Sequence, residues 1–296
     1  MLKCLVTGGS SLLGKYLLQT KPDEVELYST WFTNHIQNSI QLDVGNKSQI
    51  AYIFEKIKPE IVIHCAAVGS VDYTESHFLE THAVNVLGTE NILKASENCT
   101  FVYISTNAVF DGINPPYNEN SECHPINRYG SIKREAEIRV MNSRNWIIIR
   151  PFLLYGFPYP NGRQNWMTII INKLSQGKEV HLVDDTYWQP TLAEDCALAI
   201  WQLLDKTEDI YHVASDDRMT LFEFGLKVAR IWGYDLSLVQ PIASSSLKIA
   251  PRPKDTTFNL TKIHDLGIKL RGVEEGLSHL ERKQSKLNLN LSEFLK

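Results

Sequence analysis

Cysteine is scarce in this sequence, with only five among 296 residues. The cysteines form no Cys-x-x-Cys pair and no Cys/His pair at metal-ligand spacing; they are Cys4, Cys65, Cys99, Cys123 and Cys196. We therefore expect no metal site and no disulfide framework. The odd number and the scatter of the cysteines favour a reducing compartment, which predicts a cytoplasmic protein.

Long apolar runs and a strong charge of one sign are absent as well. No hydrophobic stretch approaches the ~18 residues that a membrane-spanning helix needs. The formal net charge is −4, which gives no electrostatic basis for nucleic acid or an anionic membrane as the main partner. The sequence also lacks repeats and low-complexity segments.

Short β-rich segments alternate with helical stretches through the first half of the chain. We expect strands at residues 2–7, 25–30, 61–67, 101–106 and 146–151, and helices at 11–20, 46–57, about 70–99 and 129–142. Continuous apolar strands separated by helices are typical of a parallel sheet covered on both faces. The predicted fold class is therefore α/β, a doubly wound parallel sheet of the Rossmann type.

The pattern changes after Pro151. Residues 152–166 are rich in Tyr, Pro, Asn and Gly and predict a loop, followed by helices near 166–176, 191–205 and 220–232 and a strand at 210–215. We expect a nucleotide-binding domain over residues 1–151. A smaller substrate-binding α/β region over 152–296 would follow and lend a strand or two back to the main sheet.

A glycine turn follows the first strand and opens a helix, in the run Val-Thr-Gly-Gly-Ser-Ser-Leu-Leu-Gly that ends at Gly14. In that context Gly8 suits a tight turn, and Gly14 allows the helix to pack closely on the strand. The helix N-terminus then faces a pyrophosphate. Ser11 occupies the position of the usual middle glycine, where it narrows the approach of the phosphates but adds a hydroxyl.

Residues 28–33, at the end of the second strand, hold no Asp or Glu to bind an adenosine ribose. They hold no Arg or Lys for a 2′-phosphate either. The sequence therefore favours NADP(H), with NAD(H) also possible.

Tyr129 and Lys133 are four residues apart at the start of a predicted helix, on one face of it. An ammonium beside the phenol is expected to lower the tyrosine pKa and to make it a proton donor and acceptor. The spacing alone is weak, since Tyr52 and Lys56 also match it and predict only a surface or packing pair. Ser105 and Thr106, at the end of the preceding strand, place hydroxyls where a substrate carbonyl would bind.

Several segments together are similar to the extended short-chain dehydrogenases/reductases, and in particular to the dTDP-4-dehydrorhamnose reductase group. The segments are TGGSSLLG (7–14), HCAA (64–67), ISTNAVFDG (104–112), YGSIK (129–133), the QPT step within 183–200 and APRPKDTTFNL (250–260). The resemblance implies reduction of the 4-keto group of a nucleotide-linked 6-deoxysugar by NAD(P)H. A homodimer is a possible assembly.

The resemblance also implies roles for single residues. The catalytic set would be Thr106, Tyr129 and Lys133, and the last two would also contact the cofactor. The other cofactor-binding residues would be Gly8, Ser10, Ser11, Leu12, Leu13, Asp43, Val44, Ala66 and Ala67. Substrate contacts are expected from Ser105, Asn107, Trp188 and Arg252. Two of these have plain alternatives, because Asp43 also suits a helix cap or turn and Arg252 a surface cation.

Two departures keep other functions open. Asn107 and Ala108 replace an acid and an aromatic residue of the group's STDYVFDG motif. Relatives such as the β subunit of methionine adenosyltransferase bind a nicotinamide cofactor and serve as regulatory subunits, so a non-catalytic role is an alternative. A nucleotide-sugar epimerase or dehydratase is another, although these enzymes hold NAD tightly and the ribose acid is missing.

Overall fold

The computed structural model describes residues 1–247 and 249–287, and a seven-stranded sheet forms its centre. The order across the sheet is β3-β2-β1-β4-β5-β6-β11, with every neighbouring pair parallel. The strands are β1 (Leu2–Thr7), β2 (Val25–Trp31), β3 (Ile40–Gln41), β4 (Ile61–His64), β5 (Thr100–Ile104), β6 (Trp146–Pro151) and β11 (Asp209–Val213). The predicted doubly wound Rossmann fold is confirmed.

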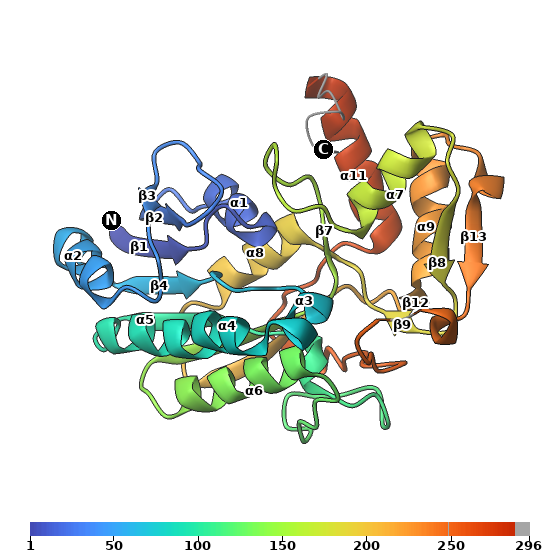
Figure 1. Ribbon diagram of the computed structural model, residues 1–296. Coiled ribbons are helices and arrows are strands. Elements are labelled where there is room, and N and C mark those ends of the chain that lie inside the picture. Colours follow the sequence, from blue (N-terminus) through green and yellow to red (C-terminus); the bar gives the residue numbers. More distant parts are fainter. Residues whose placement is uncertain (248, 288–296) are drawn as a thin grey trace.

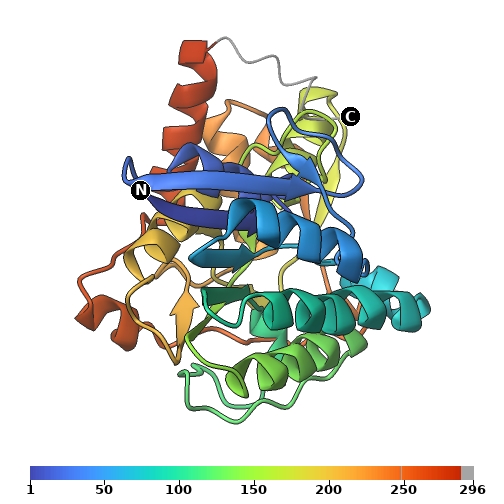
Figure 2. The same ribbon diagram turned by 90° about the vertical axis from the view of Figure 1, so that its left-hand side faces the viewer.

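Helices cover both faces of this sheet, as Figures 1 and 2 show. One face carries α1 (Leu12–Gln19), α8 (Ala193–Gln202) and α10 (Thr261–Asp265), and the other carries α2 (Lys47–Ile57), α5 (Thr89–Ala95) and α6 (Arg128–Met141). Successive residues of β1 serve the two faces, since Cys4 and Val6 join the first core while Leu5 joins the second. Burial on both sides explains why these strands read as continuous apolar runs.

The segment between β4 and β5 is not the single helix expected from the sequence. It consists of α3 (Val71–Ser76), α4 (Phe78–His82), a π-helical stretch (Ala83–Gly88) and α5. The break at His77 has a non-helical backbone, and in the π-helix the side chain of Asn85 bonds the backbone N–H and C=O of Val68 at 2.8 and 3.0 Å. π-helical turns are rare and are frequently found at functional sites.

The second half of the chain builds a smaller lobe with its own core, on the right in Figure 1. Its helices are α7 (Trp166–Ser175), α9 (Leu221–Ile231) and α11 (Val273–Leu287), packed around the parallel pair β8 (Val180–Val183) and β13 (Val239–Ile242). Two short pairs lie between the lobes: β7 (Leu154–Tyr155) with β10 (Thr191–Leu192), and β9 (Tyr187–Trp188) with β12 (Met219–Thr220).

The second half of the chain also contributes one strand and one helix to the main sheet and its cover. β11 leaves the second half and pairs with β6 at the sheet edge, and α8 packs on α1. Of the predicted substrate-binding region, residues 288–296 lie outside the described residues. Within the described part of the chain, no helix has both the length and the apolar character to cross a membrane.

Candidate functional site

The glycine turn lies at the point where the chain switches direction across the sheet. β1 is flanked by β2 on one side and by β4 on the other, and ligands of doubly wound folds bind at the carboxyl ends of strands at such a point. Gly8 has a φ of +67°, and a Cβ there would come within 2.6 Å of the backbone nitrogen of Ala66. A Cβ on Gly14 would lie 2.6 Å from the carbonyl oxygen of Gly8. Both glycines are therefore required by close packing around the turn.

The N-terminus of α1 has groups that suit a pyrophosphate. Ser11 caps the helix, and its Oγ accepts a hydrogen bond from the backbone N–H of Gly14 at 3.0 Å. The N–H groups of Leu12 and Leu13, in the first turn, have no acceptor within the helix. Ser11 has an ordinary φ of −73°, and its hydroxyl hydrogen is not used by the capping bond. The turn therefore fits the phosphates of a dinucleotide despite the serine.

At the end of β2, Thr30 forms hydrogen bonds within the protein. Thr30 is buried, its hydroxyl accepts from the backbone N–H of Gly8 at 3.3 Å, and its carbonyl accepts from Gly9 at 2.6 Å. The threonine therefore braces the turn where a ribose-binding acid stands in NAD-dependent relatives of the fold. Phe32, next along, is exposed.

Asp43 and Val44, expected beside the adenine, form a tight turn before α2. The Oδ1 of Asp43 accepts from the backbone N–H of Gly45 at 2.8 Å, whereas the cap of α2 is Asn46. Val44 is buried against Gly88 of the π-helix, where a Cβ would meet its side chain at 2.5 Å. The turn-forming alternative for Asp43 is thus realised, and an adenine contact for it stays a prediction. Ala66 and Ala67 follow β4, and Ala66 borders the glycine turn through its contact with Gly8.

Thr106 and Tyr129 are brought together by a close approach of two segments. Thr106 follows β5 and caps the short turn Asn107–Val109, and Tyr129 lies in the first turn of α6. A Cβ on Gly130 would lie only 2.1 Å from the carbonyl oxygen of Ala108, so only glycine lets α6 begin this close to that turn. The Thr106 hydroxyl lies close enough to the Tyr129 phenol to lower the pKa of that phenol.

Lys133 lies one helical turn after Tyr129 and is buried, with 2% of its surface exposed. Its Nζ donates to the carbonyl oxygen of Ile104 at 2.6 Å and sits 4.1 Å from the centre of the Tyr103 ring. Burial lowers the pKa of Lys133 to about 7, while the charges of Glu137 and Cys65 act in the opposite direction. The other matching pair behaves as predicted: Tyr52 is 60% exposed, with Lys56 above its ring on the surface.

The expected lowering of the Tyr129 pKa by Lys133 is wrong. Burial raises the pKa of Tyr129 above its ordinary value, and the opposing influences are the Thr106 hydroxyl and the Arg163 guanidinium. The Lys133 ammonium is instead directed at the end of β5. Tyr129 is therefore protonated at neutral pH, which is the form that gives a proton to a substrate oxygen.

A buried relay of hydrogen bonds beside the glycine turn was not predicted from the sequence. His64 lies between Thr7, 2.7 Å from its Nδ1, and Thr89, 3.0 Å from its Nε2. Because the Thr89 hydroxyl donates to the carbonyl of Asn85, it accepts from Nε2–H, and Thr7 donates to Nδ1. Burial, followed by the Lys133 charge, lowers the pKa of His64 to about 3, so this histidine is neutral. The motif HCAA pointed to this strand end, but not to the relay.

Arg163 is a second residue that the sequence did not indicate. It is exposed on the loop before α7, and a Cβ on Gly69 would lie 3.3 Å from its Nη1. Its charge acts on both Tyr129 and Asp72. The second half of the chain therefore places a cation over the first half of the site. No sequence signal distinguishes Arg163 from other surface arginines.

The four predicted substrate-binding residues are held in different ways. The Ser105 hydroxyl is directed away from the site, since it donates to buried Glu137 at 2.5 Å. Asn107 donates to Thr256 at 2.8 Å. Trp188 donates to Thr186 at 3.0 Å and packs between the two cores. Arg252 forms a bidentate ion pair with Asp72 of α3, at 3.0 and 2.8 Å.

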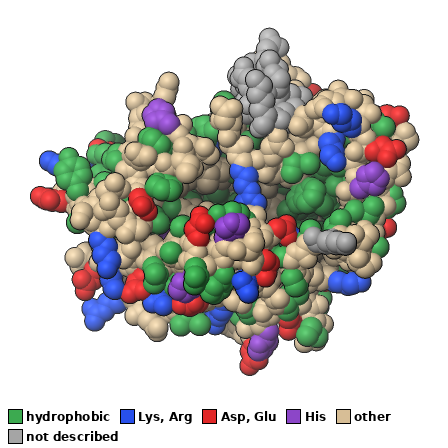
Figure 3. Space-filling view, viewed as in Figure 1, with side chains coloured by type: hydrophobic (Ala, Val, Ile, Leu, Met, Phe, Trp, Pro, Cys, Tyr) green, Lys and Arg blue, Asp and Glu red, His purple; other side chains and the backbone are tan. Residues whose placement is uncertain are grey.

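The contacts of Asn107 and Arg252 hold residues 250–257 beside the Thr106 turn and α3, and these elements border the mouth of the site. Asn127, which caps α6 through its Oδ1, also donates from Nδ2 to the carbonyl of Pro251 at 3.0 Å. The face shown in Figure 3 is hollowed near its middle, with charged side chains around the hollow. The site thus takes its chemistry from the sheet edge and its cover from the second half of the chain.

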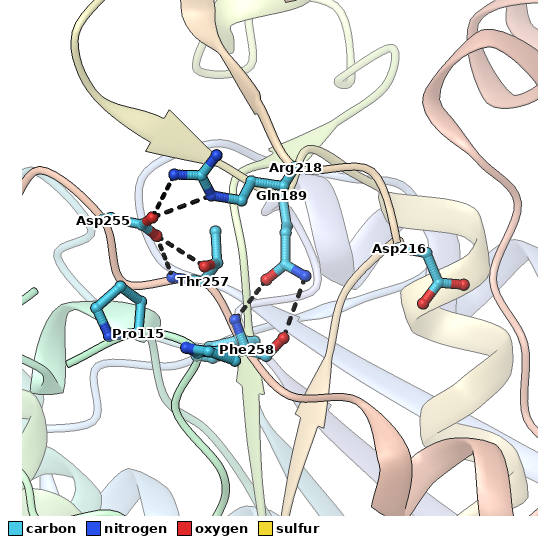
Figure 4. A pocket seen from close by; sticks show the side chains of 8 residues that line it. Pro115, Gln189, Asp216, Arg218, Asp255, Thr257 and Phe258 are labelled. Carbon is cyan, nitrogen blue, oxygen red and sulfur yellow. Dashed lines mark hydrogen bonds and ion pairs between the residues drawn. The ribbon is translucent and has the colours of Figure 1, made fainter.

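A separate cavity of about 420 Å³ lies behind this segment and is shown in Figure 4. Two sets of its polar groups bond one another: Arg218 pairs with Asp255 at 2.7 Å, and the Gln189 amide donates to the carbonyl of Phe258 and accepts from its N–H. None of the single residues given a role from the sequence lines it, although four lining residues belong to the QPT step and to segment 250–260: Gln189, Asp255, Thr257 and Phe258. No cluster of three or more His, Cys, Asp or Glu side chains suited to a metal ion occurs among residues 1–247 and 249–287.

Comparisons with known proteins cover nearly the whole chain. The family described as the RmlD substrate binding domain matches residues 2–285. The methionine adenosyltransferase 2 subunit beta of Xenopus tropicalis is 27% identical, over 93% of this chain and 87% of that protein. The spore coat polysaccharide biosynthesis protein SpsK of Bacillus subtilis is 26% identical over 96% and 99%. The structure of dTDP-4-dehydrorhamnose reductase from Bacillus anthracis in complex with NADP has a TM-score of 0.84 and 28% identity, over 96% and 99%.

Proposed function

This chain belongs to the RmlD substrate binding domain family, and on that premise we propose that it reduces the 4-keto group of a nucleotide-linked deoxysugar with NAD(P)H, favouring NADPH. One observation carries the proposal: Thr106, Tyr129 and Lys133 converge at the carboxyl ends of the strands, beside a turn that fits a dinucleotide. The similarity to a reductase solved in complex with NADP supports an oxidoreductase and a nicotinamide cofactor.

The roles of the side chains follow from their protonation states. The bound cofactor would supply a hydride to the carbonyl carbon. Tyr129, protonated at neutral pH, donates its proton to the carbonyl oxygen, and Thr106 holds that oxygen by a hydrogen bond. Lys133, buried one turn after Tyr129 and bonded to the carbonyl of Ile104, would supply positive charge beside the bound cofactor. Arg163 adds positive potential at the oxygen as negative charge develops there.

A second candidate is a cofactor-binding subunit without turnover. Several vertebrate methionine adenosyltransferase β subunits are similar to the chain at 23–28% identity. Asn107, which departs from the reductase motif, is tied to Thr256. In that case the dinucleotide would bind, Tyr129 would have no reaction to serve, and the chain would act by binding a partner enzyme.

Substitution of Tyr129 tests the reductase directly. We expect Tyr129→Phe to bind NADPH within about twofold of wild type and to lose at least ~100-fold in kcat with a 4-keto-6-deoxy nucleotide sugar, since general acid catalysis supplies ~10²–10⁴ in rate. Cofactor binding is followed by nicotinamide fluorescence and turnover by NADPH oxidation. Tyr52→Phe is the matched control, because it alters the surface pair of the same spacing.

The outcomes separate the two candidates. Turnover by wild type and Tyr52→Phe, but not by Tyr129→Phe, supports the reductase. NADPH binding without turnover by wild type on any 4-keto nucleotide sugar supports the subunit. Failure of both NADPH and NADH to bind contradicts both.

A further inference from the structure

Glu137 is a fully buried carboxylate behind the site, with 0% of its surface exposed. Ser105 donates to its Oε1 at 2.5 Å, and Arg150 donates to Oε1 and Oε2, both at 2.8 Å. Arg134 donates to Oε2 at 2.9 Å. Four donors from α6, β6 and the end of β5 therefore converge on one side chain, and Arg150 itself is only 1% exposed.

Stability alone is a poor explanation for this arrangement. A buried ion pair repays its desolvation only when its geometry is very good, and well-packed apolar side chains commonly replace such pairs without loss. The location is more informative. Glu137 lies one turn after Lys133 and two turns after Tyr129 on the same helix, so the three share one face of α6. We propose, on the basis of the proposed reductase function, that Glu137 is a positioning residue that keeps Lys133 an ammonium and fixes Thr106 through Ser105.

The first part of this proposal rests on the charges around Lys133. Tyr103 of β5 and His64 and Cys65 at the end of β4 lie near Lys133, and Tyr129 precedes it by one turn of α6. His64 is neutral, and burial raises the pKa of the Cys65 thiol to about 12, so neither is an anion at pH 7. Glu137 is therefore the negative charge that opposes the loss of the Lys133 proton.

Glu137 is itself held ionised by its surroundings. Its pKa is lowered in spite of burial, by Arg150 first, then by Ser105 and Arg134. Beyond Arg150 lie His212 of β11, Cys123 and Glu119; the histidine is neutral because burial lowers its pKa. The carboxylate thus remains negative throughout the pH range in which Lys133 titrates.

The second part rests on the end of β5. Ser105 is held from two sides, since its backbone N–H donates to the carbonyl of Ile149 at 2.7 Å and its hydroxyl to Glu137. The next residue is Thr106, whose hydroxyl contacts Tyr129. The preceding carbonyl, of Ile104, accepts from Lys133. Glu137 therefore fixes the short stretch of chain to which two groups of the site are attached.

The test compares Glu137→Gln with Glu135→Gln. Glu135 is a control on the same helix, because its half-exposed carboxylate pairs with Arg139 and not with Arg150. We expect Glu137→Gln to move the alkaline limb of kcat/KM for NADPH-dependent reduction down by about one pH unit or more, so that its deficit grows from pH 6 to pH 8. Glu135→Gln should follow the wild-type profile. A purely structural role would lower the Glu137→Gln profile equally at every pH, which would overturn the proposal.

Two further variants cover a failure of Glu137→Gln to fold with Arg150 unpaired. Glu137→Asp keeps the charge and should keep the wild-type alkaline limb. Ser105→Ala keeps the ion pair and should lower kcat about tenfold, with no shift of the profile. A shifted profile in Glu137→Asp, or unchanged kcat in Ser105→Ala, would count against the respective part of the proposal.

A readout without turnover separates this proposal from the proposed function. The pH dependence of NADPH binding, measured by fluorescence, reports the Lys133 charge whether or not a sugar is reduced. If wild type binds NADPH and reduces no sugar, only the proposed function fails. If the binding profiles of wild type and Glu137→Gln coincide, Glu137 does not set the Lys133 charge.

Discussion

Ser11 illustrates how one side chain can serve the fold and a ligand together. Its oxygen caps α1 through the N–H of Gly14, which leaves its hydroxyl hydrogen available to a phosphate at the helix N-terminus. We expect Ser11→Ala to lower the free energy of unfolding by about 1 kcal/mol, the usual cost of losing such a cap. NADPH binding should weaken about tenfold, as for a lost hydrogen bond to a charged group.

Ser11→Gly is the informative comparison, because glycine at an N-cap costs only a few tenths of a kcal/mol. Urea unfolding and NADPH fluorescence titration measure the two effects separately. Equal NADPH affinity in wild type, Ser11→Ala and Ser11→Gly would show that the hydroxyl makes no contact with the phosphates.

His64 gives a prediction about pH. Its pKa is about 3 in the folded protein and near its ordinary value in the unfolded chain, so between these values the unfolded state binds the extra proton. Its contribution to stability is therefore complete above pH 6.5 and falls by about 1.4 kcal/mol per pH unit below it. His212, also buried and neutral, acts in the same direction.

We expect His64→Gln to flatten this acid-side slope in urea unfolding measured between pH 7 and pH 5. His124→Gln is the control, since that histidine is exposed beside Glu122. Equal slopes in wild type and His64→Gln would mean that His64 is not buried neutral.

Single residues differed in how far the sequence revealed them. Gly8 and Gly14 were predictable because their role depends on local backbone geometry after a strand. The rise of the Tyr129 pKa was not, since it results from burial, which depends on how the chain packs around the residue. The same holds for Glu137, whose partner Arg150 lies on a different element.

At the scale of elements, the start of α6 is set by Gly130. Its close approach to Ala108 leaves no room for a methyl group, so Gly130→Ala must push the helix away from the Thr106 turn. We expect a loss of about 1–3 kcal/mol in stability, typical of overpacking, and at least ~10-fold in kcat as Tyr129 separates from Thr106. Urea unfolding and NADPH oxidation measure the two. Gly177→Ala is a control with open space around the residue, although its positive φ carries a separate backbone cost.

Elements with a clear period were predicted well, and the exception has a physical origin. The helices α1, α2 and α6 lie within a residue or two of their predicted limits. The stretch before β5 reads as one helix, because its apolar positions keep helical spacing. The break at His77 and the π-turn around Asn85 depend on the contact with Val68, which is a tertiary interaction.

At the scale of the whole molecule, the sheet followed from the alternation of strands and helices, but the closure of the site did not. β11 was expected as a strand, and its parallel pairing with β6 completes the sheet edge. The path of residues 250–257 over Asn107 and Asn127 has no local signature. It is visible only once both halves of the chain are in place.

Arg252 and Asp72 join the two halves and provide a test at this scale. An exposed ion pair contributes at most about 1 kcal/mol to stability, so Arg252→Ala should leave unfolding nearly unchanged. The pair nevertheless holds the covering segment against α3, beside the mouth of the site. Releasing it adds freedom that the sugar nucleotide must remove on binding. We therefore expect KM for the sugar nucleotide to rise about tenfold, with kcat and NADPH affinity little changed.

Lys227→Ala is the matched control, because it breaks a similarly exposed ion pair, Lys227–Glu274, that does not involve residues 250–257. Its KM should stay within about twofold of wild type. Asp72→Asn should reproduce the effect of Arg252→Ala if the pair acts by holding the segment. A rise in KM confined to Arg252→Ala would instead mean that the guanidinium contacts the substrate itself, and no rise in either variant would leave Arg252 as a surface cation.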